Sequence, residues 1–446
     1  MRSYKKIMPL LLTVALLGSM AYSIKSKWEL QKEYETALED ARSLYQKGII
    51  VDAFDRYQDA LAIQPSLAGY LEAGEMFLEA GNYTSAKRWY DRTLLELYPK
   101  EAETYLYGLR VYAANGNYNE LFSVYDAYQD RNLQSAEVDE FIEKYLYVYS
   151  LIGEFSDVGV FNPVSGCAAV KYEDHWGYIR KDGERQLPYI YAEAGMLEDY
   201  APVIDENGSA FYIDAEGNEK INENFILEKD PAFGAVSEFQ NIESGLALAY
   251  NGEVWNYYDI ETFEMRFGGF RDALPTPNGI GAVSMNGTKW AIIDHNGTPL
   301  TDYVYDEVLA DGKSVSSRNG ILLVRMGREY FQIDTAGNPI GTARYSGAKA
   351  YHDTTWAAVK KNGRWLFIDH EGGEHDLGNF EDAESFSNGL AAVKQNGLWG
   401  YIDVTGNMVI ENVFYGAGPY QSGGIAFVES TPGTWQLLTL FRYNHS

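Results

Sequence analysis

The chain has 446 residues and a formal net charge of −28, from 64 Asp and Glu against 36 Lys and Arg. Hydrophobic residues make up 46% of it, which excludes an acidic disordered chain, and the negative charge argues against a protein that binds nucleic-acid phosphates. The single cysteine excludes an internal disulfide framework and any metal site built from several cysteines.

Residues 1–27 form a separate segment with an uncharged run at residues 7–24. Five basic residues flank this run: Arg2, Lys5, Lys6, Lys25 and Lys27. Its length as a helix is about 27 Å, just enough to cross a hydrocarbon core. We therefore predict an uncleaved signal anchor with its N-terminus inside the cell and the other domains outside the cytoplasmic membrane. The alternative is a secretory signal that is cleaved near Ser19-Met20-Ala21, which would release the protein.

Helical periodicity and a recurring turn mark residues 28–155. Glycine-led strings recur 33, 35 and 37 residues apart, and they are Gly48-Ile49-Ile50-Val51-Asp52-Ala53, Gly81-Asn82-Tyr83-Thr84-Ser85-Ala86, Gly116-Asn117-Tyr118-Asn119-Glu120-Leu121 and Gly153-Glu154-Phe155. Ala53, Tyr57, Ala60 and Leu61 have the spacing of one buried helical stripe. This pattern predicts paired helices, which Pro65 and Pro99 end in the first two units.

This block resembles the tetratricopeptide repeat. The residues that carry the resemblance are Ala41, Leu44, Gly48, Ala53, Tyr57, Ala60 and Pro65 in the first unit and Gly74, Phe77, Gly81, Ala86, Tyr90 and Pro99 in the second. Small residues let paired helices approach, and a turn glycine permits the left-handed conformation. We expect the unit that ends at Phe155 to cap the stack. The resemblance implies a solenoid with a groove for a peptide or protein, and the alternative is a rigid spacer.

Asn-Gly turns replace the helical pattern in residues 156–446. Four of these pairs lie between apolar runs, at Asn251-Gly252, Asn286-Gly287, Asn362-Gly363 and Asn396-Gly397. Such pairs favour tight hairpins, because type I′ turns need positive φ at both central residues. The block is therefore predicted to be all-β.

One sequence frame repeats through this block, and its clearest copy covers residues 387–407. That copy contains an apolar run Leu390-Ala391-Ala392-Val393, the Asn-Gly turn, Trp399-Gly400 and a second turn at Asp403-Val404-Thr405-Gly406. The position of Asp403 is occupied in other copies by Arg180, Asp214, Asp259, Asp294, Asp334 and Asp369. The position of Trp399 is occupied by Trp176, Ala210, Trp255, Trp290, Tyr330 and Trp365. With a truncated copy from Gly424 to Trp435, the frame predicts about eight units.

The frame resembles the WG repeat, also called the KWG repeat, which is named for its Trp-Gly step. Trp176-Gly177 and Trp399-Gly400 match it fully. Other residues replace the glycine elsewhere, at Asn256, Ala291, Phe331 and Leu366. The resemblance implies a bacterial protein, and it implies little about biochemical role.

Apolar runs that do not alternate indicate strands that are buried on both faces. Neighbouring blades of a propeller sandwich each other in this way, so we predict a propeller-like ring, with an open β-solenoid of stacked hairpins as the alternative. Longer units place extra loops near residues 222–241 and 306–319, where function often lies on a regular scaffold. The predicted class is thus an α+β multidomain protein with a tetratricopeptide-like solenoid at residues 28–155 and a WG-repeat β domain at residues 156–446.

The turn aspartates are predicted to be structural. Each can accept a hydrogen bond from the backbone N–H two residues on, and the glycine three residues on takes the left-handed conformation. Calcium binding is the rival interpretation, but one carboxylate per turn lacks the density of a calcium loop.

The sequence contains no catalytic motif that we assign. The densest histidine cluster, His370-Glu371-Gly372-Gly373-Glu374-His375, lacks the spacing of a zinc protease helix and is predicted to be a turn. Cys167 lies in an apolar strand and is predicted to be a small buried residue. We assign no catalytic, cofactor or metal residues, and the ligand-binding residues stay unknown.

These patterns favour a non-enzymatic scaffold of the cell envelope that binds proteins through its helical and WG repeats. A second hypothesis is a carbohydrate or cell-wall-binding module that stacks sugars on exposed Trp and Tyr. Its main candidates are the repeat tryptophans Trp176, Trp255, Trp290, Trp365 and Trp399. A propeller-type hydrolase is the third hypothesis. We expect a protein partner, membrane contact through residues 7–24, and no nucleic acid.

Overall fold

The computed structural model describes residues 27–220, 245–250, 253–259, 262 and 264–443. Two compact units divide the chain between Val148 and Tyr149, one helical and one built of strands. The predicted anchor at residues 7–24 lies outside the described residues. None of the helices in the described part combines the length and the hydrophobicity needed to cross a membrane.

The first unit consists of short helices joined by tight turns. After helical residues 27–46 come α2 (Ile50–Ile63), α3 (Leu67–Glu79), α4 (Tyr83–Trp89), the π-helical turn η1 (Tyr90–Leu94), α5 (Leu95–Leu97), α6 (Ala102–Ala114), α7 (Tyr118–Asp130) and α8 (Ala136–Glu143). Ser66, Asn82, Asn117 and Ser135 cap four of these helices, because each side chain accepts a backbone N–H from the first turn. The turn glycines Gly48, Gly81 and Gly116 all have positive φ, as predicted.

The predicted stripe on α2 is buried, with exposures of at most 3% for Ala53, Tyr57, Ala60 and Leu61. Helix α3 also has the close approach that its glycine predicts. A Cβ atom on Gly74 would lie 2.8 Å from the Tyr107 ring, and the Tyr107 hydroxyl donates to the Gly74 carbonyl oxygen at 2.8 Å. A larger residue at this position would therefore separate α3 from α6.

The last residues assigned to the helical block form a strand instead of a helical cap. Strand β1 (Tyr149–Phe155) pairs antiparallel with the last strand of the chain, β30 (Thr434–Leu440). The string Gly153-Glu154-Phe155 imitates the turn of the helical repeats, but Phe155 is buried opposite Trp435. Long-range pairing outweighs the local pattern here.

The described residues of the second unit form eight antiparallel sheets in chain order, which we number as blades. Blade 1 contains β2 (Asp157–Val158), β3 (Cys167–Tyr172), β4 (His175–Arg180) and β5 (Arg185–Tyr191), and blade 2 contains β6 (Glu193–Ala194), β7 (Tyr200–Ile204), β8 (Ala210–Asp214) and β9 (Glu219–Lys220). Blade 3 contains β10 (Leu246–Tyr250), β11 (Trp255–Asp259) and β12 (Met265–Phe270). Blade 4 contains β13 (Asp272–Leu274), β14 (Ile280–Ser284) and β15 (Trp290–Asp294), with the 3-10 turn η4 (Pro277–Gly279).

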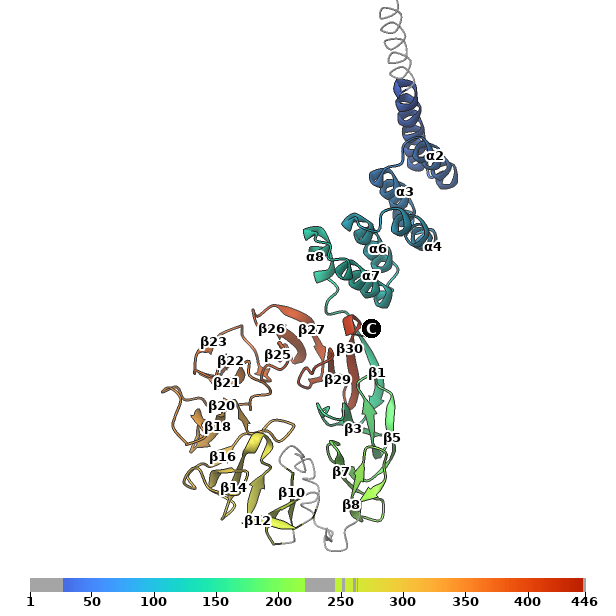
Figure 1. The fold of residues 1–446 in the computed structure, drawn as a ribbon. Coiled ribbons are helices and arrows are strands. Elements are labelled where there is room, and N and C mark those ends of the chain that lie inside the picture. Colours follow the sequence, from blue (N-terminus) through green and yellow to red (C-terminus); the bar gives the residue numbers. More distant parts are fainter. Residues whose placement is uncertain (1–26, 221–244, 251–252, 260–261, 263, 444–446) are drawn as a thin grey trace, which may run out of the picture. The chain divides into compact units, whose positions relative to one another are not determined.

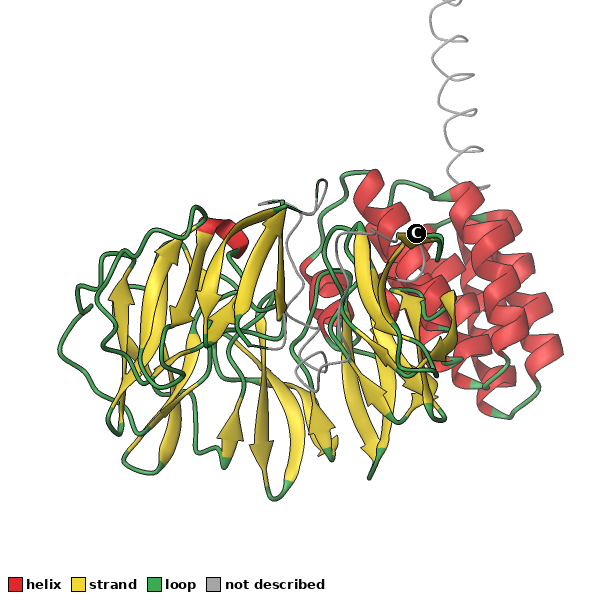
Figure 2. Cartoon of the chain, turned by 90° about the horizontal axis from the view of Figure 1, so that it is seen from below, coloured by secondary structure: helices red, strands yellow, loops and turns green. Residues whose placement is uncertain are grey.

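Blades 5 to 8 follow in the same manner. Blade 5 contains β16 (Glu307–Val308), β17 (Ser317–Arg318), β18 (Ile321–Met326) and β19 (Glu329–Asp334), and blade 6 contains β20 (Gly347–Ala348), β21 (Ala357–Lys361), β22 (Arg364–Ile368) and β23 (Glu374–His375). Blade 7 contains β24 (Asp382–Ala383), β25 (Leu390–Gln395), β26 (Leu398–Asp403) and β27 (Met408–Phe414). Blade 8 contains β28 (Gly416–Ala417), β29 (Ile425–Thr431) and β30, with β1 at the edge. Figure 2 shows these strands in yellow, joined by loops in green.

The blades close into a ring, so the unit is an eight-bladed β-propeller and the open solenoid is excluded (Figure 1). Buried clusters join successive blades, for example Phe367 of blade 6 with Ala391 of blade 7. The ring closes where β1 completes blade 8, and its Phe155 packs in one cluster with Ala168 of blade 1 and Phe427 of blade 8. The truncated last repeat is thus completed by residues that precede the first one.

An aromatic pair recurs in the blades and accounts for the repeat tryptophan. The Trp position pairs with an aromatic residue fifteen positions later on the outer strand or bridge, as in Trp176 with Tyr191, Trp255 with Phe270, Trp290 with Tyr305, Tyr330 with Tyr345 and Trp399 with Phe414. In blade 8 the partner of Trp435 is Phe155, which comes from the start of the ring. The tryptophans are therefore packing residues of the blade.

Buried tyrosines bind blades 1, 3 and 7 to the blades that follow them, and they account for part of the tyrosine content. The hydroxyl groups of Tyr178, Tyr257 and Tyr401 donate to backbone carbonyl oxygens of the following blade, and each side chain is at most 1% exposed. Each of these tyrosines stands two residues after the repeat tryptophan. Because a buried hydroxyl without a partner is costly, these bonds help to fix the spacing of the blades.

The predicted aspartate turns are confirmed. Oδ1 of Asp334 and of Asp403 accepts backbone N–H groups two and four residues on, and Gly337 and Gly406 have φ of 83° and 85°. The Asn-Gly turns at Asn362 and Asn396 have positive φ at both residues, also as predicted. At Asn286-Gly287 only the glycine has positive φ, because the Asn286 side chain accepts two backbone N–H groups and holds a wider turn. The pair Asn251-Gly252 lies outside the described residues.

The turn glycines also pack against the preceding blade, which supplies a prediction. A Cβ atom on Gly406 would lie 3.0 Å from the Leu377 carbonyl oxygen, whereas one on Gly397, which has a similar φ, meets nothing within 4 Å. We expect Gly397→Ala to cost about 1 kcal/mol of unfolding free energy from left-handed strain. Gly406→Ala should cost a further ~1–3 kcal/mol from overpacking. Denaturant titration of both variants measures the difference, and equal losses would contradict the packing role.

The aspartate turns are also expected to make the stability of the ring depend on pH. The side chain of Asn338 and nearby backbone N–H groups hold the pKa of Asp334 below its ordinary value, and Asn218 does the same for Asp214. This stabilisation is present above the ordinary aspartate pKa near ~3.9 and is lost as the pH falls through the lower folded value. Asp334→Asn should therefore narrow the gap between the unfolding free energies at neutral pH and near pH ~3. An unchanged gap would count against this role.

Candidate functional site

Most of the buried polar residues in the described part of the ring lie in the segments that join the first short strand of a blade to its next strand. We call them connectors, and in the described residues they are 159–166, 195–199, 275–279, 309–316, 349–356, 384–389 and 418–424. Their buried polar residues are Asn162, Glu198, Thr276, Ser314, Ser316, Ser385, Ser387 and Gln421. Buried polar side chains need hydrogen-bond partners, so these segments are places where the surrounding groups decide the local structure.

Hydrogen bonds link the connectors of neighbouring blades to one another. The Phe161 backbone N–H of blade 1 donates to Oε1 of Gln421 in blade 8 at 3.1 Å. The Ser165 hydroxyl of blade 1 donates to the Leu197 carbonyl of blade 2, and Asn388 of blade 7 donates to the Tyr420 carbonyl of blade 8. The connectors therefore follow one another around the ring, like the blades that carry them.

The blade 5 connector crosses the middle of the ring. A Cβ atom on its Gly312 would lie 3.2 Å from Cγ1 of Val160 in blade 1, which stands four blades away and thus directly opposite. This connector belongs to the extra loop predicted at residues 306–319, and the other predicted loop, at residues 222–241, lies outside the described residues. The longer unit thus places its added residues on the axis.

Asp311 shapes this crossing loop. Its Oδ1 accepts the backbone N–H groups of Lys313 and Val315 at 2.8 and 2.9 Å, the same pattern as in the outer aspartate turns. Ser314 occupies the position of the turn glycine and has φ of 59°, a conformation that serine rarely adopts. A non-glycine residue kept in this region marks a place where the surrounding structure imposes the conformation.

Charged side chains from three blades meet beside this loop. The Asp311 side chain is 1% exposed and its Oδ2 lies 2.6 Å from Nη2 of Arg318. His352 of blade 6 stands between two carboxylates, with Nδ1 4.0 Å from Oδ2 of Asp311 and Nε2 3.8 Å from Oε2 of Glu384. Glu384 of blade 7 also accepts from Nζ of Lys349 at 2.8 Å. We call Asp311, Arg318, His352, Glu384 and Lys349 the axial charge cluster.

The pKa values in this cluster reflect burial that is compensated by opposite charge. Burial alone would raise the pKa of Glu384, but His352 and Lys349 hold it below its ordinary value. Burial would lower the pKa of Lys349, and Glu384 raises it instead. Both groups therefore stay charged around neutral pH.

Some buried polar atoms near the axis have no hydrogen-bond partner among the described residues. They are Nε of Arg318, Nε2 of His352, Oγ of Ser316 and Oγ1 of Thr276. The 3.8 Å between His352 and Glu384 is an ionic contact and is too long for a hydrogen bond. Buried polar atoms without partners usually meet water or a ligand, so these atoms mark where a polar ligand would form hydrogen bonds.

The other candidates from the sequence have structural roles in the described residues. Trp255 and Trp365 are buried, whereas Trp176, Trp290 and Trp399 are half-buried against their outer strands, which weakens the sugar-stacking hypothesis. Nε2 of His375 contacts Oδ2 of Asp369 at 3.0 Å, and the His375 ring stacks on Trp356. No group of three or more His, Cys, Asp or Glu in the described part could hold a metal ion. Cys167 is buried and free, as predicted, and burial raises the pKa of its thiol.

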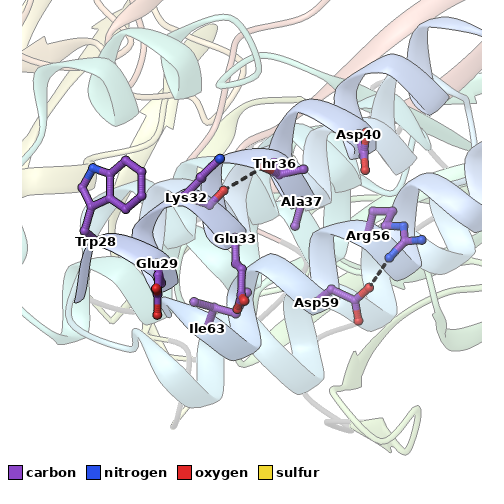
Figure 3. A pocket seen from close by; sticks show the side chains of 10 residues that line it. All are labelled: Trp28, Glu29, Lys32, Glu33, Thr36, Ala37, Asp40, Arg56, Asp59 and Ile63. Carbon is purple, nitrogen blue, oxygen red and sulfur yellow. Dashed lines mark hydrogen bonds and ion pairs between the residues drawn. The ribbon is translucent and has the colours of Figure 1, made fainter. Parts of the chain in front are cut away.

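A pocket in the helical unit offers a weaker candidate (Figure 3). It lies between helical residues 27–46 and α2 and is lined by Trp28, Glu29, Lys32, Glu33, Thr36, Ala37, Asp40, Arg56, Asp59 and Ile63. Arg56 is paired with Asp59 of its own helix at 3.0 Å, and the Thr36 hydroxyl donates to the Lys32 carbonyl in the preceding turn. These polar groups thus form contacts within their own helices and do not converge on one point of the pocket.

The described fold and site define a class: an eight-bladed propeller whose connectors meet at the axis. The family model described as "WG containing repeat" matches residues 378–399 and 399–430, which supports a WG-repeat protein. Comparison with curated proteins gives no match.

Solved structures similar to the chain share little sequence with it. BamB from Moraxella catarrhalis is 11% identical, with a TM-score of 0.41 over 66% of this chain and 98% of that one. The computationally designed Ika8 protein is 11% identical, with a TM-score of 0.42 over 64% and 96%. The WD40 β-propeller domain of Doa1 is 10% identical, with a TM-score of 0.30 over 66% and 96%.

Proposed function

We propose that this protein is a non-catalytic scaffold that binds a partner protein on the connector side of its propeller. The observation that carries the proposal is the meeting of connectors from different blades around one axis, where the blade 5 loop crosses to Val160 of blade 1. Loops held by a rigid framework commonly carry binding function. The eight blades supply such a framework.

The chemistry at the axis supports binding in preference to catalysis. Asp311 is paired with Arg318, and Glu384 with Lys349, so both acids of the cluster are already paired with bases. A general base needs a free acceptor aimed at the substrate or at a nucleophile. Ion pairs of this kind are suited to holding loops and to recognising charge.

The helical unit completes the proposal as a tetratricopeptide-like solenoid that carries the propeller on a membrane anchor at residues 7–24, outside the cytoplasm. Capped helices with tight glycine contacts, such as α3 at Gly74, support a solenoid. Protease treatment of intact and of permeabilised cells tests the placement. Protection of the propeller until the membrane is opened would contradict it.

Site-specific photo-crosslinking tests the binding face. A photoreactive residue at Ser422, which is exposed in the blade 8 connector, is compared with one at Val413, which is 48% exposed on the outer strand β27. We expect a discrete crosslinked product from Ser422 in native cells and none from Val413. Equal capture at the two positions, or capture at neither, would overturn the proposed face.

A further inference from the structure

Lys313 stands at the tip of the crossing loop with an unusual set of neighbours. Its ammonium group has no ion-pair or hydrogen-bond partner among the described residues, although its side chain is half-buried. Burial lowers its pKa; Asp311 and Asp353 oppose that shift, whereas the bases Arg318 and Lys181 add to it. Contacts bring a second blade to this region, since Gly312 packs against Val160 of blade 1 and Lys181 of the same blade donates to Ser422 of blade 8.

The acids near Lys313 are already committed to other groups. Asp311 binds Arg318 and two backbone N–H groups of its own loop. The oxygens of Asp353 accept the backbone N–H groups of Thr355 and Asn388, both at 2.7 Å. These two carboxylates attract Lys313 from a distance, but neither forms an ion pair with it.

Hydrogen-bond donors that could contact a ligand come from blades on opposite sides of the axis. Lys181 belongs to blade 1, and its Nζ donates to the Ser422 hydroxyl of blade 8 at 3.2 Å. Lys313 and Arg318 belong to blade 5, and the buried Nε of Arg318 has no acceptor within the described part of the chain. A group held between these blades would be surrounded by N–H donors that carry positive charge, the arrangement that binds carboxylates and phosphates most strongly.

We propose that the axis of the propeller binds an anionic group, a carboxylate or a phosphate, between Lys313, Lys181 and Nε of Arg318. This inference rests on the proposed scaffold function and names the chemistry of what the scaffold recognises. The anion is either free in solution or an acidic group of the partner. Both sources present the same oxygens to the three bases.

Titration calorimetry of the full chain with inorganic phosphate tests the site. We expect saturable binding by the native protein and about tenfold or more weaker binding by Lys313→Gln, because one charged contact is lost. Lys313 makes no ion pair in the described residues, so this variant should keep its fold, and its unfolding curve verifies this. The matched control is Lys361→Gln, which removes the same charge from a pair with Glu374 on blade 6 and should bind phosphate normally.

Two results would overturn the site: absence of phosphate binding by the native protein, or equal binding by Lys313→Gln. Repeating the Ser422 crosslinking with added phosphate separates the two sources, since competition would show that the partner supplies an acidic group to the same site. Binding of phosphate without competition would assign the site to a free anion. Phosphate binding without any crosslinked partner would refute the scaffold alone, and crosslinking without phosphate binding would refute the anion site alone.

Discussion

Replacement of Asp311 by alanine is expected to lower the unfolding free energy of the propeller by about 3–5 kcal/mol, because it leaves the charge of Arg318 partly buried and unpaired. The same change removes the acceptor that holds the backbone N–H groups of Lys313 and Val315, so the crossing loop loses its turn. Because Ser314 is in a left-handed conformation that serine disfavours, we expect the loop to leave its native conformation once these hydrogen bonds are lost. Denaturant titration of the full chain measures this loss.

Asp334→Ala is the matched control, because Asp334 forms the same backbone turn in the same blade but is only half-buried and has no ion pair among the described residues. Its loss should be limited to the turn, at about 1 kcal/mol. The difference between the two variants therefore isolates the buried ion pair with Arg318. Similar losses would show that Asp311 is only another turn residue and would remove the main structural support of the axial charge cluster.

The repeat frame was sufficient to predict the blades, because each unit is mostly local. A strand, a tight turn, a return strand and an aspartate turn follow one another within a few residues, and each leaves its own residue pattern. The frame also predicted the number of units. It could not locate the end of the ring, because the partner of Trp435 is Phe155, and no local pattern links two residues that far apart.

The glycine of the Trp-Gly step is required by the neighbouring outer strand and not by its own strand. A Cβ atom on Gly177 would lie 2.7 Å from the Pro188 carbonyl oxygen, because the outer strand bulges over it. In blade 3 the position holds Asn256, and the outer strand has Gly268 at the point of contact. At this point of contact, a glycine on either of the two paired strands provides the space that is needed. The apparent departures from the repeat frame are therefore partly compensated on the facing strand.

For the candidate site, the sequence predicted the position of the loop along the chain but not the contacts that the loop makes. The added length near residues 306–319 indicated a loop with a role, and the spacing of Asp311 and Ser314 copies the aspartate turn. What the loop meets depends on the radius of the closed ring, which brings Gly312 to Val160. The pairing of Glu384 with Lys349 and the position of His352 likewise depend on the angle between neighbouring blades. No spacing along the chain specifies those contacts.

Phe155→Ala is expected to open the ring at its seam. Phe155 is 5% exposed, faces Trp435 and packs edge-on against Phe427 at 6.3 Å between ring centroids. Its loss should cost about 3–5 kcal/mol, the usual range for a buried phenylalanine. Because β1 is held to the ring by this pairing, amide hydrogen exchange should increase in β1 and β30 before the ring unfolds as a whole.

Phe270→Ala separates this seam effect from simple loss of core volume. Phe270 occupies the same position relative to Trp255 as Phe155 does to Trp435, but it lies within one continuous blade. We expect a comparable loss of unfolding free energy with the protection of β1 and β30 retained. Equal protection of β1 in the two variants would mean that the backbone pairing of Tyr149 to Ile152 closes the ring without the aromatic contact. Loss of β1 protection only in Phe155→Ala would place the closing energy in that contact, where the first residues of the ring complete its last repeat.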